Sequence, residues 1–212
     1  VAHRLRNERL VHRVAEARMP TPFGEWKVFG YRNDVDTHEH VALTFGDVST
    51  GEGILVRMHS KCLTGDVFHS MRCDCGWQLE TAMQMIQQEG RGVIVYLDQE
   101  GRGIGLLNKL KAYELQDQGA DTVEANERLG LAVDAREYRQ CAEVLFDLGL
   151  CKVRVISNNP GKLQALEEAG MEIVERVAIE TPASERATAY LRTKKEKMGH
   201  LLELKKIASS WD

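Results

Sequence analysis

Residues 92–105 read GVIVYLDQEGRGIG, and this stretch decides the class of fold. The unbroken apolar run Val93–Leu97 is typical of a strand that is buried on both faces. A glycine-rich loop, Asp98–Gly105, follows it directly and leads into a predicted helix. Glycines let a backbone approach a phosphate, and a helix N-terminus offers free N–H groups to an anion. The loop is therefore either a phosphate-binding loop or a bare turn, and Arg102 within it favours phosphate because guanidinium groups match phosphate oxygens.

Outward from this strand, the downstream chain alternates helical and strand-like segments, whereas the upstream chain carries short β-prone pieces between turns. Predicted helices lie near 77–86, 105–118, 135–148 and 162–169, and predicted strands lie at 26–31, 40–45, 54–58, 152–156 and 172–177. Alternation of this kind indicates an α/β layer, and the upstream pieces indicate antiparallel pairing. The sequence therefore predicts an α+β fold: a mixed sheet with antiparallel N-terminal strands, an α/β-type central layer and a helical C-terminal tail.

The two ends of the chain differ from the rest. Residues 1–18 have apolar positions at helical spacing (Leu5, Leu10, Val11 and Val14), and prolines at 20 and 22 end that pattern. A charged stretch after Ser184 predicts a helix with a solvated face, which carries Lys194, Lys195 and Lys197. We expect an N-terminal helix or linker at 1–19, a main domain at 20–206 and a short tail at 207–212.

Composition excludes several classes of protein. With 43% hydrophobic and 28% charged residues, the chain is not disordered, and its apolar runs are far shorter than the about 20 residues of a membrane span. No secretory signal is visible. Residues 1–18 and 192–206 together carry +7 and the whole chain −4, so the remainder sums to −11, the reverse of a chain built to grip nucleic acid. We expect a soluble, cytoplasmic protein without a nucleic-acid or membrane partner.

Three of the five cysteines are grouped as Cys62-x10-Cys73-x-Cys75, which is the spacing of a metal site. In a cytosolic chain such a group favours metal binding over disulfides. Three thiolates predict zinc with its fourth position open to water, as in catalytic zinc sites. His59 or His69 would be the fourth ligand of a closed site instead, and three buried, inert cysteines are the alternative to any metal.

Two further groups of polar residues carry possible chemistry. The run from Arg57 to Lys61 ends a predicted strand and abuts the first cysteine, so it suits either anion ligands or a solvated strand edge. Asp134 and Arg136 lie at a predicted helix start, where the simpler interpretation is an N-cap aspartate beside an exposed arginine.

Together these motifs resemble a known family. The runs HSKCLTGDVFHSMRCDCGWQLE from residue 59, DQEGRGIGLLNKLKAYELQDQGADTVEAN from residue 98, LGLAVDAREY from residue 129 and ISNNPGK from residue 156 are similar to GTP cyclohydrolase II of riboflavin biosynthesis. The likeness extends from about residue 23 to Leu202. The first 18 residues also resemble the junction helix of bifunctional versions that carry a dihydroxybutanone-phosphate synthase domain upstream.

The resemblance implies zinc-dependent hydrolysis of GTP by a homodimer. The imidazole ring opens, C8 leaves as formate, pyrophosphate is cleaved off, and the product is 2,5-diamino-6-(5-phosphoribosylamino)pyrimidin-4(3H)-one. Zinc is held by Cys62, Cys73 and Cys75, and Mg²⁺ accompanies the triphosphate. Tyr113 assists at the purine, Asp134 is the proton acceptor and Arg136 is the nucleophile toward the α-phosphate. The GTP-binding positions are Arg57, Met58, His59, Ser60, Lys61, Gln78, Glu100, Gly101, Arg102, Thr122, Ser157 and Lys162.

Elementary chemistry qualifies two of these roles. A guanidinium stays protonated in proteins, so we favour charge stabilisation of the transferring phosphoryl group for Arg136. Three thiolates make a weak Lewis acid of the zinc site, so Tyr113 or a neighbouring group is expected to manage the proton.

The chain departs from the family pattern at two positions of opposite charge. Lys61 stands where the family commonly has glutamate, and Asp98 stands where it commonly has arginine. The two changes compensate if the side chains are close, and otherwise they retune or weaken the site. Three functions therefore stay open: the full reaction, a homologue that stops at the formamidopyrimidine or serves another purine-derived pathway, and a non-catalytic zinc protein that binds GTP.

Overall fold

The computed structural model describes residues 10–34, 36–49, 52–132, 134–179, 195–196 and 199–201. The first nine residues of the predicted N-terminal helix and most of the predicted charged tail, including Lys194, Lys197 and residues 207–212, lie outside this part of the chain. Among the described residues, no helix combines the length and the apolar character needed to cross a membrane.

The chain folds as two compact units. The sheet unit contains residues 1–61, 80–98 and 137–179, and the loop unit contains residues 62–79, 99–136 and 180–212. The chain leaves the sheet unit after Lys61 and again after Asp98. The domain limits expected at residues 20 and 206 stay a prediction.

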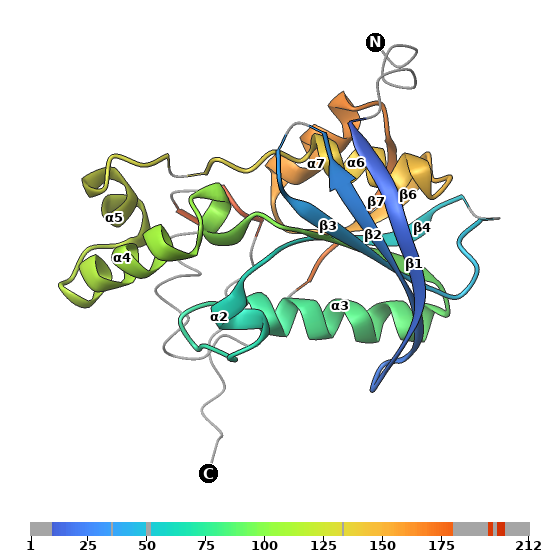
Figure 1. The fold of residues 1–212 in the computed structure, drawn as a ribbon, viewed down its shortest axis with the longest axis horizontal. Coiled ribbons are helices and arrows are strands. Elements are labelled where there is room, and N and C mark those ends of the chain that lie inside the picture. Colours follow the sequence, from blue (N-terminus) through green and yellow to red (C-terminus); the bar gives the residue numbers. More distant parts are fainter. Residues whose placement is uncertain are drawn as a thin grey trace. The chain divides into compact units, whose positions relative to one another are not determined.

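The sheet unit is built on a seven-stranded sheet in the order β1-β2-β3-β5-β4-β6-β7 (Figure 1). Its strands are β1 (Val11–Thr21), β2 (Gly24–Asn33), β3 (Glu39–Phe45), β4 (Ile54–Ser60), β5 (Gly92–Leu97), β6 (Lys152–Ile156) and β7 (Glu172–Val177). The strands β1, β2, β3 and β5 pair antiparallel, and β5, β4, β6 and β7 pair parallel. The predicted mixed sheet with antiparallel N-terminal strands is therefore confirmed.

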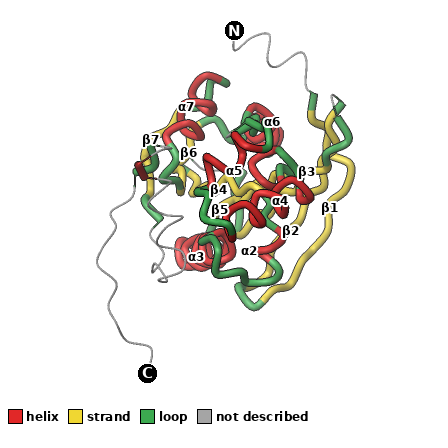
Figure 2. The backbone as a smooth tube through the Cα atoms, turned by 90° about the vertical axis from the view of Figure 1, so that its left-hand side faces the viewer, coloured by secondary structure: helices red, strands yellow, loops and turns green. Residues whose placement is uncertain are grey.

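Helices cover both faces of this sheet. Helix α3 (Cys75–Glu89) lies along one face, and α6 (Arg139–Asp147) and α7 (Pro160–Glu168) lie on the other; Figure 2 views α3 along its axis. Val93, Val95 and Leu97 enter the core shared with α6 and α7. On the opposite face, a Cβ at Gly92 would lie 2.8 Å from Ile86 of α3, so only glycine permits this close packing. The central strand is buried on both faces, as its apolar run predicts.

The N-terminal segment is a strand where helical spacing predicts a helix. Residues 11–18 belong to β1, which pairs with β2 from Val11 opposite Asn33 to Thr21 opposite Gly24. Its apolar positions bury little: Val11 is buried, but the side chain of Val14 is 61% exposed. Edge pairing and the two hydrogen bonds that Leu10 N–H and Val11 N–H donate to Glu143 Oε2 fix the backbone as extended. A weak local pattern is overridden here by tertiary contacts.

The loop unit consists of short helices joined by turns. Its elements are α2 (Leu63–Asp66), the 3₁₀ helix η1 (Glu100–Gly103), α4 (Leu106–Asp117), α5 (Thr122–Arg128) and the first residues of α3. Asp121 caps α5 and forms a capping box with Glu124, so a local signal for this unpredicted helix is present in the sequence. A small cluster of Ala112, Ala120 and Ala125 packs α4 against α5.

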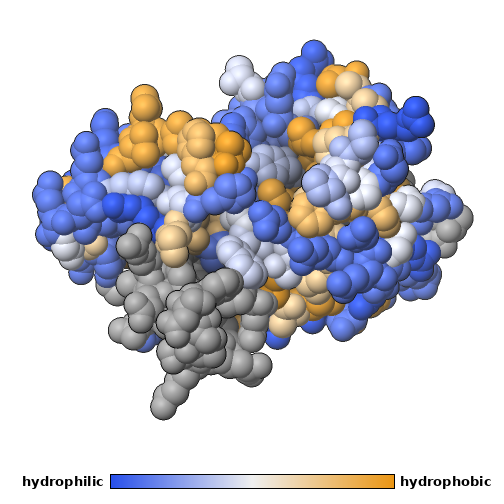
Figure 3. Space-filling model, turned by 90° about the horizontal axis from the view of Figure 1, so that it is seen from below, coloured by the Kyte–Doolittle hydropathy of each residue, from blue (hydrophilic) through white to orange (hydrophobic). Residues whose placement is uncertain are grey.

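Large apolar side chains also reach the surface of the loop unit. Phe68 is 68% exposed and Leu107 is 74% exposed, and Val67, Met71, Trp77 and Leu110 are exposed as well. Figure 3 shows apolar side chains grouped among charged ones on one face of the molecule. Exposed apolar groups of this kind are typical of interaction surfaces.

Candidate active site

The three cysteines of the sequence motif come together in the loop unit. Cys62 precedes α2, and Cys73 and Cys75 lie in the turn that opens α3. Their Sγ atoms all lie within 4.8 Å of one another, and those of Cys62 and Cys73 are 3.7 Å apart. Two thiolates on a tetrahedral zinc with Zn–S bonds of about 2.3 Å are separated by about 3.8 Å. The donor set and its spacing therefore fit zinc.

The surroundings of the cysteines fit a bound ion as well. A Cβ at Gly65 of α2 would lie 2.9 Å from Cys73 Sγ and 3.1 Å from Cys62 Sγ. Position 65 therefore requires glycine for the helix to pack this closely against the sulfurs. Among the described residues, Cys62, Cys73 and Cys75 form the group of three side chains that could hold a metal ion. His69 of the same unit does not belong to this group. A position left open for a non-protein ligand is the arrangement of catalytic zinc sites.

The protonation of the cysteines is unequal. Hydrogen bonds from the thiols of Cys73 and Cys75 lower the pKa of Cys62, against the opposing effect of burial, and Lys109 lowers it further. The same hydrogen bonds raise the pKa of Cys73 to about 11 and raise the pKa of Cys75 well above its ordinary value. Because zinc binds thiolates, a bound ion would displace the protons that Cys73 and Cys75 hold.

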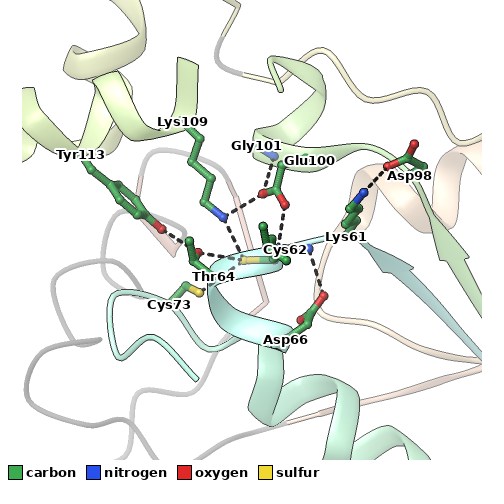
Figure 4. Close-up of polar contacts among 11 residues, drawn as sticks. Lys61, Cys62, Thr64, Asp66, Cys73, Asp98, Glu100, Gly101, Lys109 and Tyr113 are labelled. Atoms are coloured by element: carbon green, nitrogen blue, oxygen red, sulfur yellow. Dashed lines mark hydrogen bonds and ion pairs between the residues drawn. The ribbon is translucent and has the colours of Figure 1, made fainter. Parts of the chain in front are cut away.

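Two residues of α4 reach the cysteines from one face of the helix (Figure 4). Lys109 Nζ lies 3.1 Å from Cys62 Sγ and 2.8 Å from Glu100 Oε1. Tyr113, one turn further on, has its hydroxyl 3.3 Å from Thr64 Oγ1, which in turn lies 3.7 Å from Cys62 Sγ. Tyr113 is a predicted site residue, whereas Lys109 is not. The signal that would have found Lys109 is its i, i+4 spacing from Tyr113.

The glycine-rich loop after β5 is strained and tightly bonded. Gly101 has φ 62°, and Arg102 has φ 62° as well, a left-handed conformation that is uncommon for a residue with a side chain. Leu63 N–H donates to Glu100 Oε2 at 2.6 Å, and Gly101 N–H donates to Glu100 Oε1 at 3.0 Å. Strain held in place by surrounding bonds is typical of functional loops.

The segment Asp134–Arg136 packs against this loop. Ala135 N–H donates to the carbonyl oxygen of Arg102 at 3.0 Å, and a Cβ at Gly103 would lie 2.9 Å from the Ala135 carbonyl. Arg136 Nε donates to Asp134 Oδ1 at 2.8 Å, and Arg136 Nη2 pairs with Asp134 Oδ2. The glycine-rich loop and the segment Asp134–Arg136 are thus in contact, although positions 103 and 134 are 31 residues apart in the sequence.

The prediction that Asp134 lies at a helix start is wrong. Helix α6 begins at Arg139, and its N-cap is Tyr138. Asp134 instead accepts the backbone N–H of Arg136 and the guanidinium of the same residue. Burial alone would raise its pKa, but the hydrogen bonds and charge of Arg136, with the charge of Arg102, lower the pKa of Asp134 below its ordinary value.

Gln78 and Thr122 are the remaining predicted site residues of the loop unit. Gln78 Nε2 donates to Asp74 Oδ2 at 2.6 Å, so a buried aspartate between two of the cysteines orients Gln78. Thr122 is the first residue of α5, next to its Asp121 cap.

The predicted residues of the sheet unit gather at the carboxyl end of its parallel strands. Arg57 of β4 donates to the Ile156 carbonyl of β6 at 3.0 Å, and Lys162 of α7 donates to the Met58 carbonyl at 2.8 Å. Arg57, His59, Ser157 and Lys162 are all buried. Met58 itself is fully buried in the hydrophobic core, so its side chain serves packing. Ligands of open parallel sheets bind at this edge.

The two departures of opposite charge lie side by side in the sheet unit. Lys61 Nζ is 3.0 Å from Asp98 Oδ1, and His38 Nδ1 is 3.3 Å from Asp98 Oδ2. Burial alone would raise the pKa of Asp98, but the hydrogen bonds from Lys61 and His38 lower it below its ordinary value. The closeness on which charge compensation depends is therefore confirmed.

Comparisons with known proteins identify the family of this chain. The family model of GTP cyclohydrolase II matches residues 12–178. "Riboflavin biosynthesis protein RibBA" of Bacillus cereus is 55% identical over 204 residues, 96% of this chain and 51% of that protein. The protein of the same name from Salinispora tropica is 56% identical over 203 residues, 95% of this chain and 51% of that protein. The chain thus spans about half the length of these curated relatives.

Among solved structures, RibBX of A. baumannii, a two domain 3,4-dihydroxy-2-butanone 4-phosphate synthase, aligns with a TM-score of 0.46 at 18% identity. That alignment covers 85% of this chain and 43% of the other. The match to the family model, which covers most of this chain, shows the family. The chain belongs to the GTP cyclohydrolase II family of enzymes.

Proposed function

We propose that this chain performs the complete GTP cyclohydrolase II reaction of riboflavin biosynthesis: zinc-dependent opening of the imidazole ring of GTP, release of C8 as formate and release of pyrophosphate. The product is then 2,5-diamino-6-(5-phosphoribosylamino)pyrimidin-4(3H)-one. The observation that carries the proposal is the assembled trio of Cys62, Cys73 and Cys75 in a chain of this family. A zinc ion held by these sulfurs would supply a Lewis acid that activates water at neutral pH.

Tyr113 suits the role of a proton donor in this site. Burial raises the pKa of its phenol above the ordinary value, although the hydrogen bond with Thr64 and the charge of Lys109 oppose the shift. The phenol therefore stays protonated at neutral pH and can give a proton to a departing nitrogen. Thr64, which also lies beside Cys62, holds the hydroxyl in place.

Asp134 and Arg136 suit a charge-stabilising pair better than a base and a nucleophile. A carboxylate with a lowered pKa that is held by a guanidinium in two places is a weak base. The guanidinium keeps its positive charge and is suited to stabilise the transferring phosphoryl group. We therefore assign Asp134 to the positioning of Arg136.

Replacing Asp134 by asparagine tests this assignment. The amide keeps the shape but loses the charge, so we expect kcat/KM to fall by about 10-fold to 100-fold through misplacement of Arg136. The pKa of Asp134 lies below the usual value of about 3.9, so the ion pair is complete above pH 5 and weakens only as the pH falls through that lowered pKa. Because that pKa lies below the range, the pH profile of the variant between pH 5 and 9 should keep its wild-type shape in either role, and the size of the loss in kcat/KM decides between the roles. A loss of about 10⁴-fold, the upper size of a general acid–base contribution, would instead identify Asp134 as the proton acceptor.

The buried cations of the sheet unit support binding of an anionic substrate. Arg57 and Lys162 each donate a hydrogen bond to a backbone carbonyl at the carboxyl edge of the sheet, where Ser157 also lies. We propose that they bind GTP together with Glu100, Gly101, Arg102, Gln78 and Thr122, and that Mg²⁺ accompanies the triphosphate. The exposed apolar side chains of the loop unit support the expected homodimer, and a cytoplasmic location stays part of the proposal.

The Lys61–Asp98 pair gives a charge-exchange test of compensation. Lys61→Glu or Asp98→Arg alone places like charges side by side, so each is expected to raise KM for GTP by about fivefold, or about 1 kcal/mol. The double variant restores an opposite pair and should return KM close to the wild-type value. Steady-state kinetics of the four proteins give the coupling, and strict additivity of the two effects would contradict compensation.

One incubation separates the proposed function from its alternatives. Protein is mixed with GTP and Mg²⁺, and formate, pyrophosphate and the pyrimidine are measured separately. All three are expected in equal amounts. Pyrophosphate without formate would identify a homologue that stops at the formamidopyrimidine, and nucleotide binding without any product would identify a non-catalytic GTP-binding protein.

A further inference from the structure

Lys109 lies between a predicted metal ligand and the carboxylate of the glycine-rich loop. Its ammonium is 3.1 Å from Cys62 Sγ and 2.8 Å from Glu100 Oε1, and Figure 4 shows the side chain reaching from α4 to both. The side chain is only 12% exposed. A lysine that is withdrawn from water to this extent needs partners for its charge, and the two contacts provide them.

The surrounding backbone holds Lys109 in this position. Glu100 bonds to the residue that follows Cys62, because Leu63 N–H donates to Glu100 Oε2 at 2.6 Å. The other carboxylate oxygen, Oε1, accepts from Lys109. The stem of the lysine passes close to Gly101, where a Cβ would lie 3.2 Å from Lys109 Cβ. The ring of Tyr113 closes the other side, with its centroid 5.8 Å from Nζ. The ammonium is thus preorganised beside the sulfur.

The contact of Lys109 with Cys62 offsets negative charge at the metal site. Three thiolates leave a bound divalent ion with one excess negative charge, and the carboxylate of Glu100 adds another. An N–H donor on a ligand sulfur draws electron density from it, so the sulfur donates less to the ion and the ion remains a stronger Lewis acid. Groups of this kind around metal ligands change metal affinity or activity by about 10-fold to 100-fold when they are replaced.

We propose that Lys109 is a positioning residue that tunes the metal site by holding a charged hydrogen bond on Cys62, with Glu100 as its anchor. The inference rests on the proposed function, because it takes the three cysteines to be the zinc ligands. It explains how a site with three thiolates can remain acidic enough for hydrolytic chemistry. It also gives Glu100 an internal role that its position in the loop alone does not reveal.

The test compares four variants of the full chain. Lys109→Met removes both charge and donor, Lys109→Gln keeps a neutral donor, and Lys109→Arg keeps charge and donor. Lys111→Met is the matched control, because Lys111 lies two residues away on α4 with an exposed side chain. Zinc affinity is measured by competition with a chelator, and the Co²⁺-substituted proteins are examined for the sulfur-to-cobalt charge-transfer band. Both readouts need no GTP.

We expect Lys109→Met to shift the charge-transfer band to longer wavelength, because the sulfur loses its hydrogen bond and donates more to the ion, and to bind zinc at least as tightly as the wild type. The ion is then a weaker Lewis acid, so kcat should fall by about 10-fold to 100-fold, more than KM rises. Lys109→Arg should recover most of the band position and of kcat, Lys109→Gln should lie between, and the control should match the wild type. If Lys109→Met is unfolded by circular dichroism, the Gln and Arg variants carry the comparison.

Two results would overturn the inference. Wild-type zinc affinity and an unshifted band in Lys109→Met would show that the contact does not reach the metal. Weaker zinc binding with an unshifted band would show that Lys109 only braces the fold. A wild-type protein that binds cobalt as expected but releases no formate would instead refute the proposed function, so the two failures are distinguishable.

Discussion

Replacing Cys75 by serine is expected to remove zinc from the protein and to lower formate release from GTP by about 10³-fold or more. The serine hydroxyl is a poor ligand at neutral pH, and two remaining thiolates do not complete the site. Metal-ion activation of water is worth several kcal/mol, and each 1.4 kcal/mol corresponds to about one factor of ten in rate. Zinc content by mass spectrometry and formate by an enzymatic assay measure the two effects together.

Cys151→Ser is the matched control for this prediction. Cys151 is exposed and lies in the sheet unit, outside the group of three cysteines. The control should keep both zinc and activity. A Cys75→Ser protein that releases formate at the wild-type rate would show that ring opening does not need the three sulfurs.

Replacing Tyr113 by phenylalanine is expected to lower formate release by about 10²-fold to 10⁴-fold, the usual size of a general acid–base contribution. The ring keeps its packing with Arg72, whose guanidinium carbon lies 4.8 Å from the ring centroid, so fold and zinc content should not change. Because burial keeps the pKa of Tyr113 above its ordinary value, the phenol remains a donor across pH 6 to 9 in the wild type. Rates of formate release with measured zinc content check the prediction.

Tyr31→Phe makes the same chemical change in the sheet unit and serves as the control. The hydroxyl of Tyr31 donates to Asp147 Oδ2 at 2.9 Å, away from the predicted site residues. Activity should survive this change. Full formate release by Tyr113→Phe would refute a role for the phenol in proton transfer and would leave water to carry the proton.

The parallel half of the fold is readable from the sequence because its signals are local and strong. Strands β6 and β7 have the predicted bounds, 152–156 and 172–177, since each carries β-branched residues between turns. Strand β1 is not readable in this way, because its apolar positions follow a helical spacing and only its pairing with β2 defines it as a strand. The short helices α2 and α5 are not predicted because they contain too few apolar residues to show a helical spacing. A capping box at the start of α5 is nevertheless present in the sequence.

The site shows the same division between local and long-range information. The cysteine trio follows from spacing alone. The two departures of opposite sign leave open whether Lys61 and Asp98 are close, and only the fold shows that they are in contact. The i, i+4 spacing places Lys109 on the same helix face as Tyr113, but its contact with Cys62 depends on a fold that brings α4 next to the residue before α2. The helix start assigned to Asp134 fails because the pairing with Arg136 competes with capping.

An open site of three thiolates is tested most directly by zinc X-ray absorption on protein that has been shown to release formate from GTP. We predict one zinc per chain, with three sulfur neighbours at about 2.3 Å and one oxygen neighbour. Replacement of Cys75 should remove this signal and the activity together. Absence of stoichiometric zinc from active protein, or a fourth protein ligand that closes the coordination sphere with nucleotide bound, would contradict the mechanism.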